Sequence, residues 1–573
     1  MIQIATSTGI VLDWLLQAIV VENTLNRLAT AQLIIFDGTL LEEEFGAAND
    51  PALAVGQSIT IQVNGSHGLE KLFTGIIVKQ NLRCSAEMGT LLCLELKHAA
   101  VKMSHARRSK VFVDKDENTI FQDLVKRSKI SMNSISTGTH SVEKSIQYNV
   151  SDWDFLIMRA EANGLLIAAN GEKLEIFSPR IEKSTSLKFR LGQDILELDA
   201  AIDARQQYAT TQSHTWDFES LKPQDTKTTQ NSSVNEQFKA PDRSALSQSQ
   251  GDDPNQLLQP GDHPKDEMSA WADAQVMRSA LGRIRGTVKI TGEARVKAGG
   301  TIEISGASNA FNGLHFVSAV RHEFSDGSWT TDLELGLDQE RYASAFDVND
   351  VPVSGLLAKM PGLQLGKVEQ VKDDPRKQHR VKVSFVGLPD KHEGVWARVA
   401  SLDAGKNHGM FFRPQVGDEV LLGFLNEDPR DVMVLGGLYN GKDHKPPFAV
   451  DKDGYNEQGI LTAAGIKLKF SEKDDSILLE TKKGDKIQVV GKKSGSEGIR
   501  MQDQFGNLIE MGRKGITIKS KTALKLEAGS KMDIKTVELN GEAKSTLKMK
   551  GNASAEISSS GVTIIKGSLV KIN

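Results

Sequence analysis

The stretch Gly515-Ile-Thr-Ile-Lys-Ser-Lys-Thr-Ala-Leu-Lys-Leu-Glu-Ala-Gly-Ser-Lys-Met-Asp-Ile-Lys535 decides the fold of the C-terminal region, because its apolar residues recur every eight positions. After a shift of one residue in phase the spacing returns further along the chain, and Thr546, Ser554, Val562 and Val570 keep the same interval. The recurring apolar residues are Ile516, Ile518, Leu524, Leu526, Met532, Ile534, Met549, Ile557 and Ile565.

Each group of eight residues is typical of a short strand with one buried face, followed by a Gly or Ser turn. One strand and one turn cannot close around a core. Three chains side by side would supply about 24 residues per layer, enough for a three-sided prism with an apolar interior. We therefore predict a homotrimeric, intertwined triple-stranded β-helix over residues 459–573, with the nine apolar residues inside. A single-chain solenoid is the alternative, but its coils need a longer repeat.

The composition favours a β-rich protein of several domains. The chain has 573 residues, 39% of them hydrophobic and 25% charged, with 6% aromatic residues against 50 glycines. This length predicts about three or four domains. The aromatic content is low for large apolar pockets, and the glycine content suits many turns.

Residues 1–345 are predicted to form two β-barrels of similar size. Strand patterns cover residues 57–63, 73–80 and 91–97, and a second set lies between residues 286 and 337. An α/β insertion is expected at about residues 105–190, with a helix over 117–130 and a second helix capped by Ser151 or Asp152. Residues 211–267 are polar and rich in Gln, Ser, Asp and Pro, which predicts a long, poorly ordered or extended connection.

A small closed barrel is predicted over residues 360–448. Five short strands with turn signals between them are typical of the oligonucleotide/oligosaccharide-binding (OB) fold. The expected strands cover residues 366–371, 380–385, 395–401, 419–425 and 432–439.

Taken in order, these segments resemble the VgrG spike proteins and their phage tail relatives. The hub motif is Tyr148-Asn-Val-Ser-Asp-Trp-Asp-Phe-Leu-Ile-Met-Arg-Ala-Glu-Ala-Asn-Gly164. The barrel motifs are Trp396-Ala-Arg-Val399, Pro414-Gln-Val-Gly-Asp-Glu-Val420 and Leu435-Gly-Gly-Leu-Tyr-Asn440. The last segment, Gly567-Ser-Leu-Val-Lys-Ile-Asn573, resembles the blunt end of the family's needle.

This resemblance implies the structural spike and hub of a contractile injection machine, in type VI secretion, an extracellular injection particle or a phage. Three hubs would form a pseudo-sixfold ring on the inner-tube protein, beside baseplate proteins. Val570, Ile572 and Asn573 would form a platform for a PAAR-type tip protein, and effectors could be carried. The spike would puncture the target envelope and touch its membrane transiently.

Two departures from the family accompany the resemblance. Only about twenty residues, Gly441 to Ile460, separate barrel from needle, too few for the lysozyme domain of some phage spikes. Glu427 stands where the family usually has Gly before Asp-Pro.

The net charge of −4 argues against a nucleic-acid partner for the whole chain. Residues 459–573 nevertheless carry 21 Lys and Arg against 13 Asp and Glu, a balance of +8. A solvated surface or an electrostatic role at an anionic envelope explains this excess. The first ten residues lack a signal-peptide pattern, and no apolar stretch is long enough to span a membrane. We therefore expect assembly in the cytoplasm and release with the injection particle.

We expect no enzyme activity, catalytic residues, cofactor or metal. The sequence contains no HExxH motif and no Cys/His cluster at zinc spacing, and the pairs Asp373–Asp374 and Asp474–Asp475 lie in expected loops. The alternative function is a tailspike-like β-helix that binds or hydrolyses glycans. A third possibility is nucleic-acid binding by Trp396, Phe411 and Phe412, although core packing is the expectation for these three side chains.

Overall fold

The computed structural model of the chain contains two compact units. The first comprises residues 1–359 with 426–428, and the second comprises residues 360–425 with 429–573. No helix among the described residues is long and apolar enough to cross a membrane. The described residues are 2–572 except 7–8, 10, 39–43, 66–67, 86–88, 134–140, 229–242, 262, 388–393, 443, 449–451, 453, 455–456 and 493–495.

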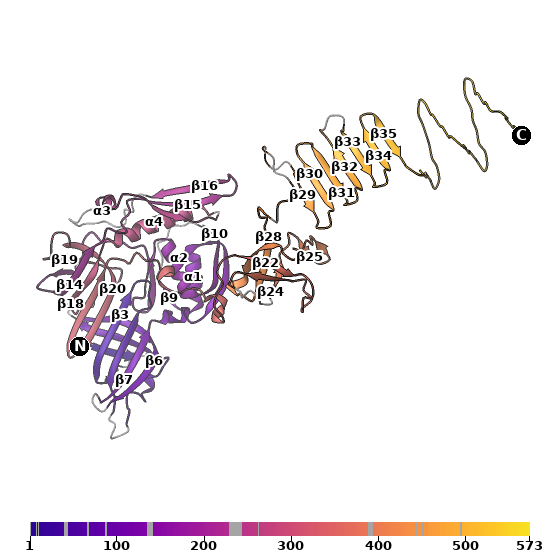
Figure 1. Cartoon of the computed structure of the whole chain (residues 1–573). Helices are drawn as coiled ribbons and strands as arrows, with labels where there is room; N and C mark the ends of the chain where they lie inside the picture. Colours follow the sequence, from indigo (N-terminus) through magenta and orange to yellow (C-terminus); the bar gives the residue numbers. More distant parts are fainter. Residues whose placement is uncertain are drawn as a thin grey trace. The chain divides into compact units, whose positions relative to one another are not determined.

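A large sheet dominates the first unit (Figure 1). Its strand order is β14-β18-β21-β20-β3-β4-β7-β6-β5-β1-β2, and β13 and β19 are attached through β20. Its N-terminal strands are β1 (Ile2–Thr6), β2 (Val11–Leu12), β3 (Leu16–Thr24), β4 (Thr30–Phe36), β5 (Ser58–Gly65), β6 (Gly68–Ser85) and β7 (Gly89–Lys97). Its later strands are β13 (Lys188–Arg190), β14 (Ile195–Ile202), β18 (Ile284–Thr291), β19 (Thr301–Ser305), β20 (Gly313–Ser325) and β21 (Ser328–Leu335).

The strands that the sequence assigned to two separate barrels share this one sheet. Strand β3 pairs with β4 on one side and with β20 on the other. Ile19 and Val21 of β3 are buried in the first core, so β3 has neither a free edge nor an exposed inner face. Periodicity locates each strand along the chain, but it does not show that β3 pairs with a strand almost 300 residues away.

The described part of the segment from Arg107 to Phe177 contains two helices and five strands outside the large sheet. It contains β8 (Arg107–Asp116), α1 (Glu117–Arg127), β9 (Ser131–Met132), β10 (Ser141–Ser151), α2 (Asp152–Ala162), β11 (Leu166–Ala168) and β12 (Lys173–Phe177). The Ser151 hydroxyl accepts a hydrogen bond from the Asp154 N–H at 3.1 Å, which caps α2 as expected. Gly164 follows α2 with a φ of 67°, and a Cβ there would lie 3.4 Å from Ala274 Cα.

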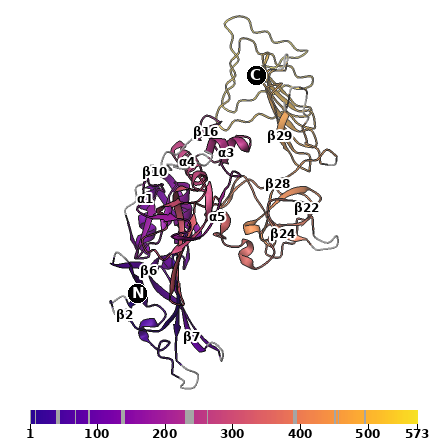
Figure 2. The same ribbon diagram turned by 90° about the vertical axis from the view of Figure 1, so that its left-hand side faces the viewer.

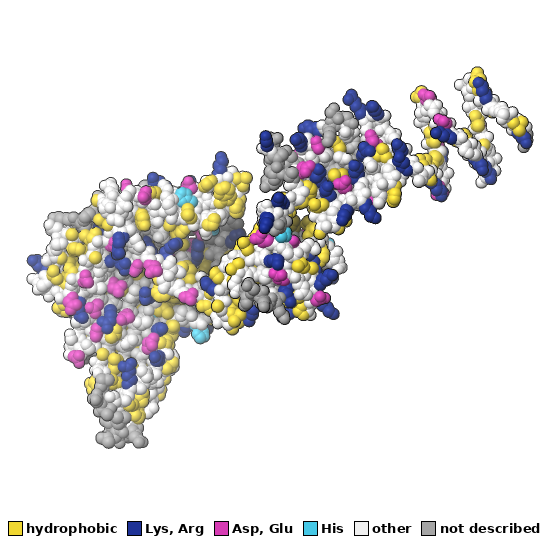
Figure 3. Space-filling model, in the orientation of Figure 1, with side chains coloured by type: hydrophobic (Ala, Val, Ile, Leu, Met, Phe, Trp, Pro, Cys, Tyr) yellow, Lys and Arg dark blue, Asp and Glu magenta, His cyan; other side chains and the backbone are white. Residues whose placement is uncertain are grey.

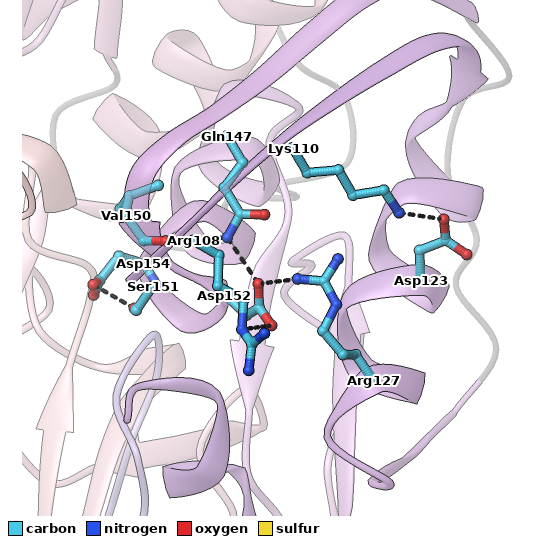
Figure 4. Close-up of polar contacts among 9 residues, drawn as sticks. All are labelled: Arg108, Lys110, Asp123, Arg127, Gln147, Val150, Ser151, Asp152 and Asp154. Carbon is cyan, nitrogen blue, oxygen red and sulfur yellow. Dashed lines mark hydrogen bonds and ion pairs between the residues drawn. The ribbon is translucent and has the colours of Figure 1, made fainter. Parts of the chain in front are cut away.

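Helix α2 carries buried charges that join it to its surroundings. Figure 4 shows Asp152 between Arg127 and Gln147, whose side chains donate hydrogen bonds at 2.8 and 2.7 Å. Arg108 lies 3.7 Å from the same carboxylate. The charge of Asp152, whose side chain is 3% exposed, is therefore compensated by groups from α1, β8 and β10.

The other end of α2 is tied to the last part of the first unit, which includes α5 (Tyr342–Ala345). The guanidinium of Arg278 pairs with the Glu161 carboxylate and donates to the carbonyl oxygen of Asp338 at 2.8 Å. Glu161 also accepts the Tyr342 N–H at 2.9 Å. The charged residues of the hub motif thus connect segments far apart in sequence.

Residues 211–267 were predicted to be poorly ordered or extended, and this prediction is wrong for the described part. The segment forms a three-stranded sheet of β16 (Lys222–Thr228), β15 (Thr211–Asp217) and β17 (Asn255–Leu258), which packs on α4 (Lys265–Leu281). Helix α3 (Arg243–Ser249) precedes β17. The buried residues of β15 are Thr211, Ser213 and Thr215, so small polar side chains replace the apolar alternation that marks a strand.

The second unit contains the predicted small barrel. Its closed strand order is β22-β23-β24-β28-β27, and the two-residue strands β25 (Ala404–Gly405) and β26 (His408–Gly409) form a hairpin outside the barrel. Val420 and Leu422 are fully buried. Glu427 has a φ of 58°, so the turn keeps the left-handed conformation that a glycine favours. The barrel strands are β22 (Gln364–Gln370), β23 (Val381–Phe385), β24 (Val395–Val399), β27 (Glu419–Phe424) and β28 (Val432–Gly437).

The buried pair of Glu161 and Arg278 yields a stability prediction. Replacing Arg278 by Met leaves the Glu161 charge uncompensated, which should lower the free energy of unfolding of the first unit by about 3–5 kcal/mol. Arg205→Met, which breaks the exposed pair with Asp203, should cost far less, because water already screens that pair. Urea unfolding of both variants measures the difference, and equal losses would contradict a stabilising role for the buried pair.

Three buried histidines predict an acid-sensitive first unit. Burial lowers the pKa of His98, His315 and His322 from 6.5 to about 4. The unfolded chain therefore binds these protons more readily than the folded chain does. Stability should be complete above pH 6.5 and should fall as the pH drops towards 4. Melting temperatures measured across this range test the prediction, and His322→Asn should reduce the slope.

Candidate functional site

Seven short strands follow the barrel and form an antiparallel sheet in sequence order (Figure 1). Each strand has five residues, and turns with Gly and Asp connect several of them. This register makes residues directly opposite one another share a face of the sheet. The strands are β29 (Glu457–Leu461), β30 (Lys467–Ser471), β31 (Ser476–Glu480), β32 (Lys486–Val490), β33 (Gly498–Gln502), β34 (Leu508–Gly512) and β35 (Gly515–Lys519).

One face of this sheet is apolar. Two rows of aliphatic, methionine and phenylalanine side chains run across the strands, because paired residues and residues two apart lie on the same side. We call this surface the apolar face. Its first row is Ile460, Leu468, Leu479, Ile487, Met501, Ile509 and Ile518, and its second row is Phe470, Ile477, Val489, Ile499, Met511 and Ile516.

The apolar face has no covering layer within the described part of the chain. Phe470 and Leu479 are each 45% exposed, and Ile516 is 70% exposed. None of the four buried hydrophobic clusters found among the described residues includes a residue of this face. A continuous apolar surface of this kind is typical of an interface.

The opposite face of the sheet carries the charged side chains of the strands, and two ion pairs cross between strands there. Lys467 lies 3.1 Å from Glu480, and Lys469 lies 2.6 Å from Glu457. These cross-strand pairs set the two faces apart chemically. The polar face is suited to water, and the apolar face is suited to another protein layer.

The nine octad residues do not come together in one chain. Ile516 and Ile518 lie in β35, and residues 520–572 contain no strand and no residue in a buried hydrophobic cluster. Figure 2 shows this segment as wide turns of the trace. Leu524, Leu526, Met532, Ile534, Met549, Ile557 and Ile565 are all at least half exposed, from 52% for Met532 to 80% for Ile557.

The residues of the expected tip platform are also open to solvent. Val570 is 46% exposed and Ile572 is 87% exposed. Asn573 lies outside the described residues. The single chain therefore brings no partner to these residues, and the platform stays a prediction.

The eight-residue spacing does not extend to the residues of β30–β34. Their signal is a pair of apolar residues two apart, as in Leu468/Phe470 and Ile477/Leu479, repeated about every ten residues. The interval differs from eight because the turns here are longer. A search for alternating pairs, without a constant repeat length, would have found them.

Two expectations about the barrel surface have clear outcomes. Core packing was expected for Phe411 and Phe412, and this is wrong, since they are 71% and 59% exposed on the loop between β26 and β27. Trp396 is half-buried with the Lys382 ammonium 5.3 Å from its ring centre.

Among the described residues, no group of three or more His, Cys, Asp or Glu side chains is arranged to hold a metal ion.

The carboxylate of Asp374 stabilises the loop that contains it by accepting hydrogen bonds from nearby residues. It accepts hydrogen bonds from Arg380 at 2.6 Å and from the Gln378 N–H at 2.7 Å. The hydrogen bond from Arg380 holds the pKa of Asp374 well below its ordinary value. A permanently charged, fully engaged carboxylate is a structural group and is poorly suited to donate a proton.

Two family models match the chain. Residues 4–326 match the Alg8 N-terminal domain, and residues 364–439 match the type VI secretion system/phage-baseplate injector OB domain. A 71-residue stretch is 44% identical to the type VI secretion system spike protein VgrG5 of Pseudomonas aeruginosa, covering 12% of this chain and 9% of the relative. The spike protein VgrG3 of Vibrio cholerae is 32% identical over 120 residues, 18% of this chain and 12% of the relative. The matches thus span less than a fifth of the length of these relatives.

Solved structures give weaker likenesses. The tail protein from Neisseria meningitidis has a TM-score of 0.43 and 13% identity, covering 59% of this chain and 96% of that chain. The E. coli c3393 protein, a component of the type VI secretion system, has a TM-score of 0.40 and 13% identity, covering 76% of this chain and 99% of that chain.

The apolar face generates a prediction about self-association. Ile487 lies at the middle of the first row, between Leu479 and Met501. A charged side chain buried there would lack a partner, so Ile487→Asp should weaken association of the full chain by about tenfold or more. Gln488→Asp places the same charge on the polar face and should leave association unchanged. Sedimentation velocity over a concentration series compares them, and equal effects would contradict the role of the apolar face.

Proposed function

This chain belongs to the family of the Alg8 N-terminal domain and is VgrG-like. From its injector OB domain and its likeness to spike proteins, we propose that three copies form the spike of a contractile injection machine. Residues 1–345 would form its hub, residues 360–448 its OB barrel, and residues 459–573 its needle. The uncovered apolar face, continued by the octads, is the observation that carries this proposal.

Self-assembly into a trimer would explain why the described residues of one chain do not cover these apolar side chains. The apolar face and the octads are continuous, because Ile516 and Ile518 belong to both. Burying an Ile, Leu or Met side chain contributes about 1.5–3 kcal/mol. The nine octad residues would therefore stabilise the trimer substantially if all of them pack inside an intertwined β-helix.

The other partners follow from the likeness to spike proteins. The hub of three copies would cap the inner tube and contact baseplate proteins. Val570, Ile572 and Asn573 would receive a PAAR-type tip protein, and effectors would travel on the spike. The particle would assemble in the cytoplasm and leave the cell, as in type VI secretion or an extracellular injection particle.

The proposed role of the chain is mechanical. Contraction of the sheath would supply the work, and the needle would supply stiffness and a narrow end that enters the target envelope. A β-helix closed by three chains has few free strand edges, so its backbone hydrogen bonds would be satisfied within the needle. No catalytic step is part of this mechanism.

Light scattering of the purified chain tests the assembly. We expect a mass of three times 62.5 kDa for the full chain. A shortened chain that ends at Phe448 lacks the apolar face and the octads, so its trimer should be weaker. It should dissociate at protein concentrations at which the full-length trimer stays intact. A monodisperse monomer of the full chain would overturn the proposal.

Injection by the assembled machine tests the mechanical role. Particles that carry the chain shortened before Gly459 should assemble a hub but fail to deliver cargo into target cells. Particles with the Gln488→Asp full chain are the matched control and should deliver normally. Normal delivery by the shortened chain would show that the needle is not needed for puncture.

A further inference from the structure

The lysines of the C-terminal octads form a charge excess that the preceding sheet does not have. Residues 457–514 contain 11 Lys and Arg against 9 Asp and Glu, a balance of +2. Residues 515–573 contain 10 Lys against 5 Asp and Glu, a balance of +5. Three copies would bring the latter to +15, since 3 × 5 is 15. The balance therefore changes where the octads begin.

Few of these lysines are neutralised by a neighbour. Among the described residues after Gly515, the ion pairs are Lys525 with Glu527 and Lys531 with Asp533. Lys548, Lys550, Lys566 and Lys571 are exposed and take part in neither pair. Figure 3 shows dark-blue Lys side chains along the visible face of this region, with few magenta acidic ones.

In the proposed trimer the octads would form strands, and alternation along those strands would place these four lysines on the outside of the needle. Successive side chains of a strand point to opposite faces. An inward Met549 therefore directs Lys548 and Lys550 outward, and an inward Ile565 directs Lys566 outward. Inward Val570 and Ile572 place Lys571 outward between them.

Two aliphatic residues share this outer surface with the lysines. Ile564 lies two residues before Lys566, and Leu569 lies two residues before Lys571, so each shares a face with its lysine. They are 70% and 74% exposed. Neither belongs to the octad series, and an inward Ile565 and Val570 leave both outside. The outer surface near the end of the octads thus combines cations with aliphatic side chains.

This chemistry fits a lipid surface better than a nucleic acid. Lysine charges bind anionic headgroups, and neighbouring aliphatic side chains enter the boundary with the acyl chains. Single-stranded nucleic acid is bound largely by stacking on aromatic side chains and by Arg. Residues 515–573 contain no Phe, Tyr, Trp or Arg.

We propose that the outer surface around Lys548, Lys550, Lys566 and Lys571 binds anionic phospholipid bilayers, with Ile564 and Leu569 inserting at the interface. This inference rests on the proposed trimer, because the trimer turns the octad residues inward and concentrates the lysines. It assigns the needle an adhesive step at the target membrane, before or during puncture, in addition to its mechanical role.

Vesicle co-sedimentation tests this binding with the full chain, after light scattering has established its mass. The wild-type chain should sediment with vesicles of phosphatidylglycerol and phosphatidylethanolamine, but not with phosphatidylcholine vesicles. Binding should fall at least tenfold between about 50 and 500 mM salt, because salt screens the charges. A trimer that does not bind the anionic vesicles would overturn the inference while leaving the proposed spike intact, whereas a monomer would overturn the spike itself.

A pair of charge-matched variants locates the surface. Replacing Lys548, Lys550, Lys566 and Lys571 by Gln should weaken vesicle binding by about tenfold or more. The control replaces four exposed lysines of the first unit by Gln, namely Lys115, Lys126, Lys183 and Lys297, and should bind like the wild type. Equal losses in both variants would overturn the assignment to the needle.

Two further measurements separate lipid from other polyanions. Ile564→Asn with Leu569→Asn keeps every charge and should reduce the binding that remains at high salt. Duplex DNA added as a competitor should displace little protein from the vesicles. Binding to DNA that equals or exceeds binding to vesicles would overturn the lipid assignment in favour of general polyanion binding.

Discussion

An apolar sheet face in contact with water is the physical constraint on which the C-terminal region of this protein depends. Thirteen apolar side chains in two rows cross seven strands, and residues such as Phe470 and Leu479 remain nearly half exposed. Consecutive strands from β29 to β35 pair their backbone groups with each other, so the sheet itself is well formed. Its apolar face, however, can leave water only against a further layer, and the described residues of the chain provide none.

The first unit, by contrast, buries its apolar side chains and some charged side chains within itself. Its large sheet has closely packed cores, and its buried charges find partners within the same unit. Asp152 is held by Arg127 and Gln147, and Glu161 is held by Arg278. Removing a charge from water is costly unless the partner is placed well, so these contacts fix how α2 meets distant segments.

The pairing of charged residues differs between the strands β29–β35 and the residues that follow them. In the sheet β29–β35, Lys467 and Lys469 pair with Glu480 and Glu457 across strands, which neutralises part of the polar face. Beyond β35 the lysines outnumber the acidic residues, and most are not in an ion pair. Strands that pair their charges gain stability locally, whereas an unbalanced surface gains it from an external anion. The proposed needle would therefore change from a self-sufficient polar exterior to one that favours an anionic surface.

The sequence alone determined the features that depend on local periodicity. Ser151 predicted the start of α2, alternating Val420 and Leu422 predicted a barrel strand, and the octads from Ile516 to Ile565 predicted an apolar stripe that one chain does not bury. It failed where strands use Thr211, Ser213 and Thr215 in place of apolar residues, since small polar side chains leave no hydrophobic pattern. It also misjudged Phe411 and Phe412, because an aromatic residue in a loop looks the same whether it is covered or exposed. Only the tertiary structure decided that β3 pairs with β20, that Glu161 meets Arg278, and that residues 457–519 form one uncovered face. These contacts join residues far apart in the chain, and their geometry depends on how whole strands pack and not on any local pattern.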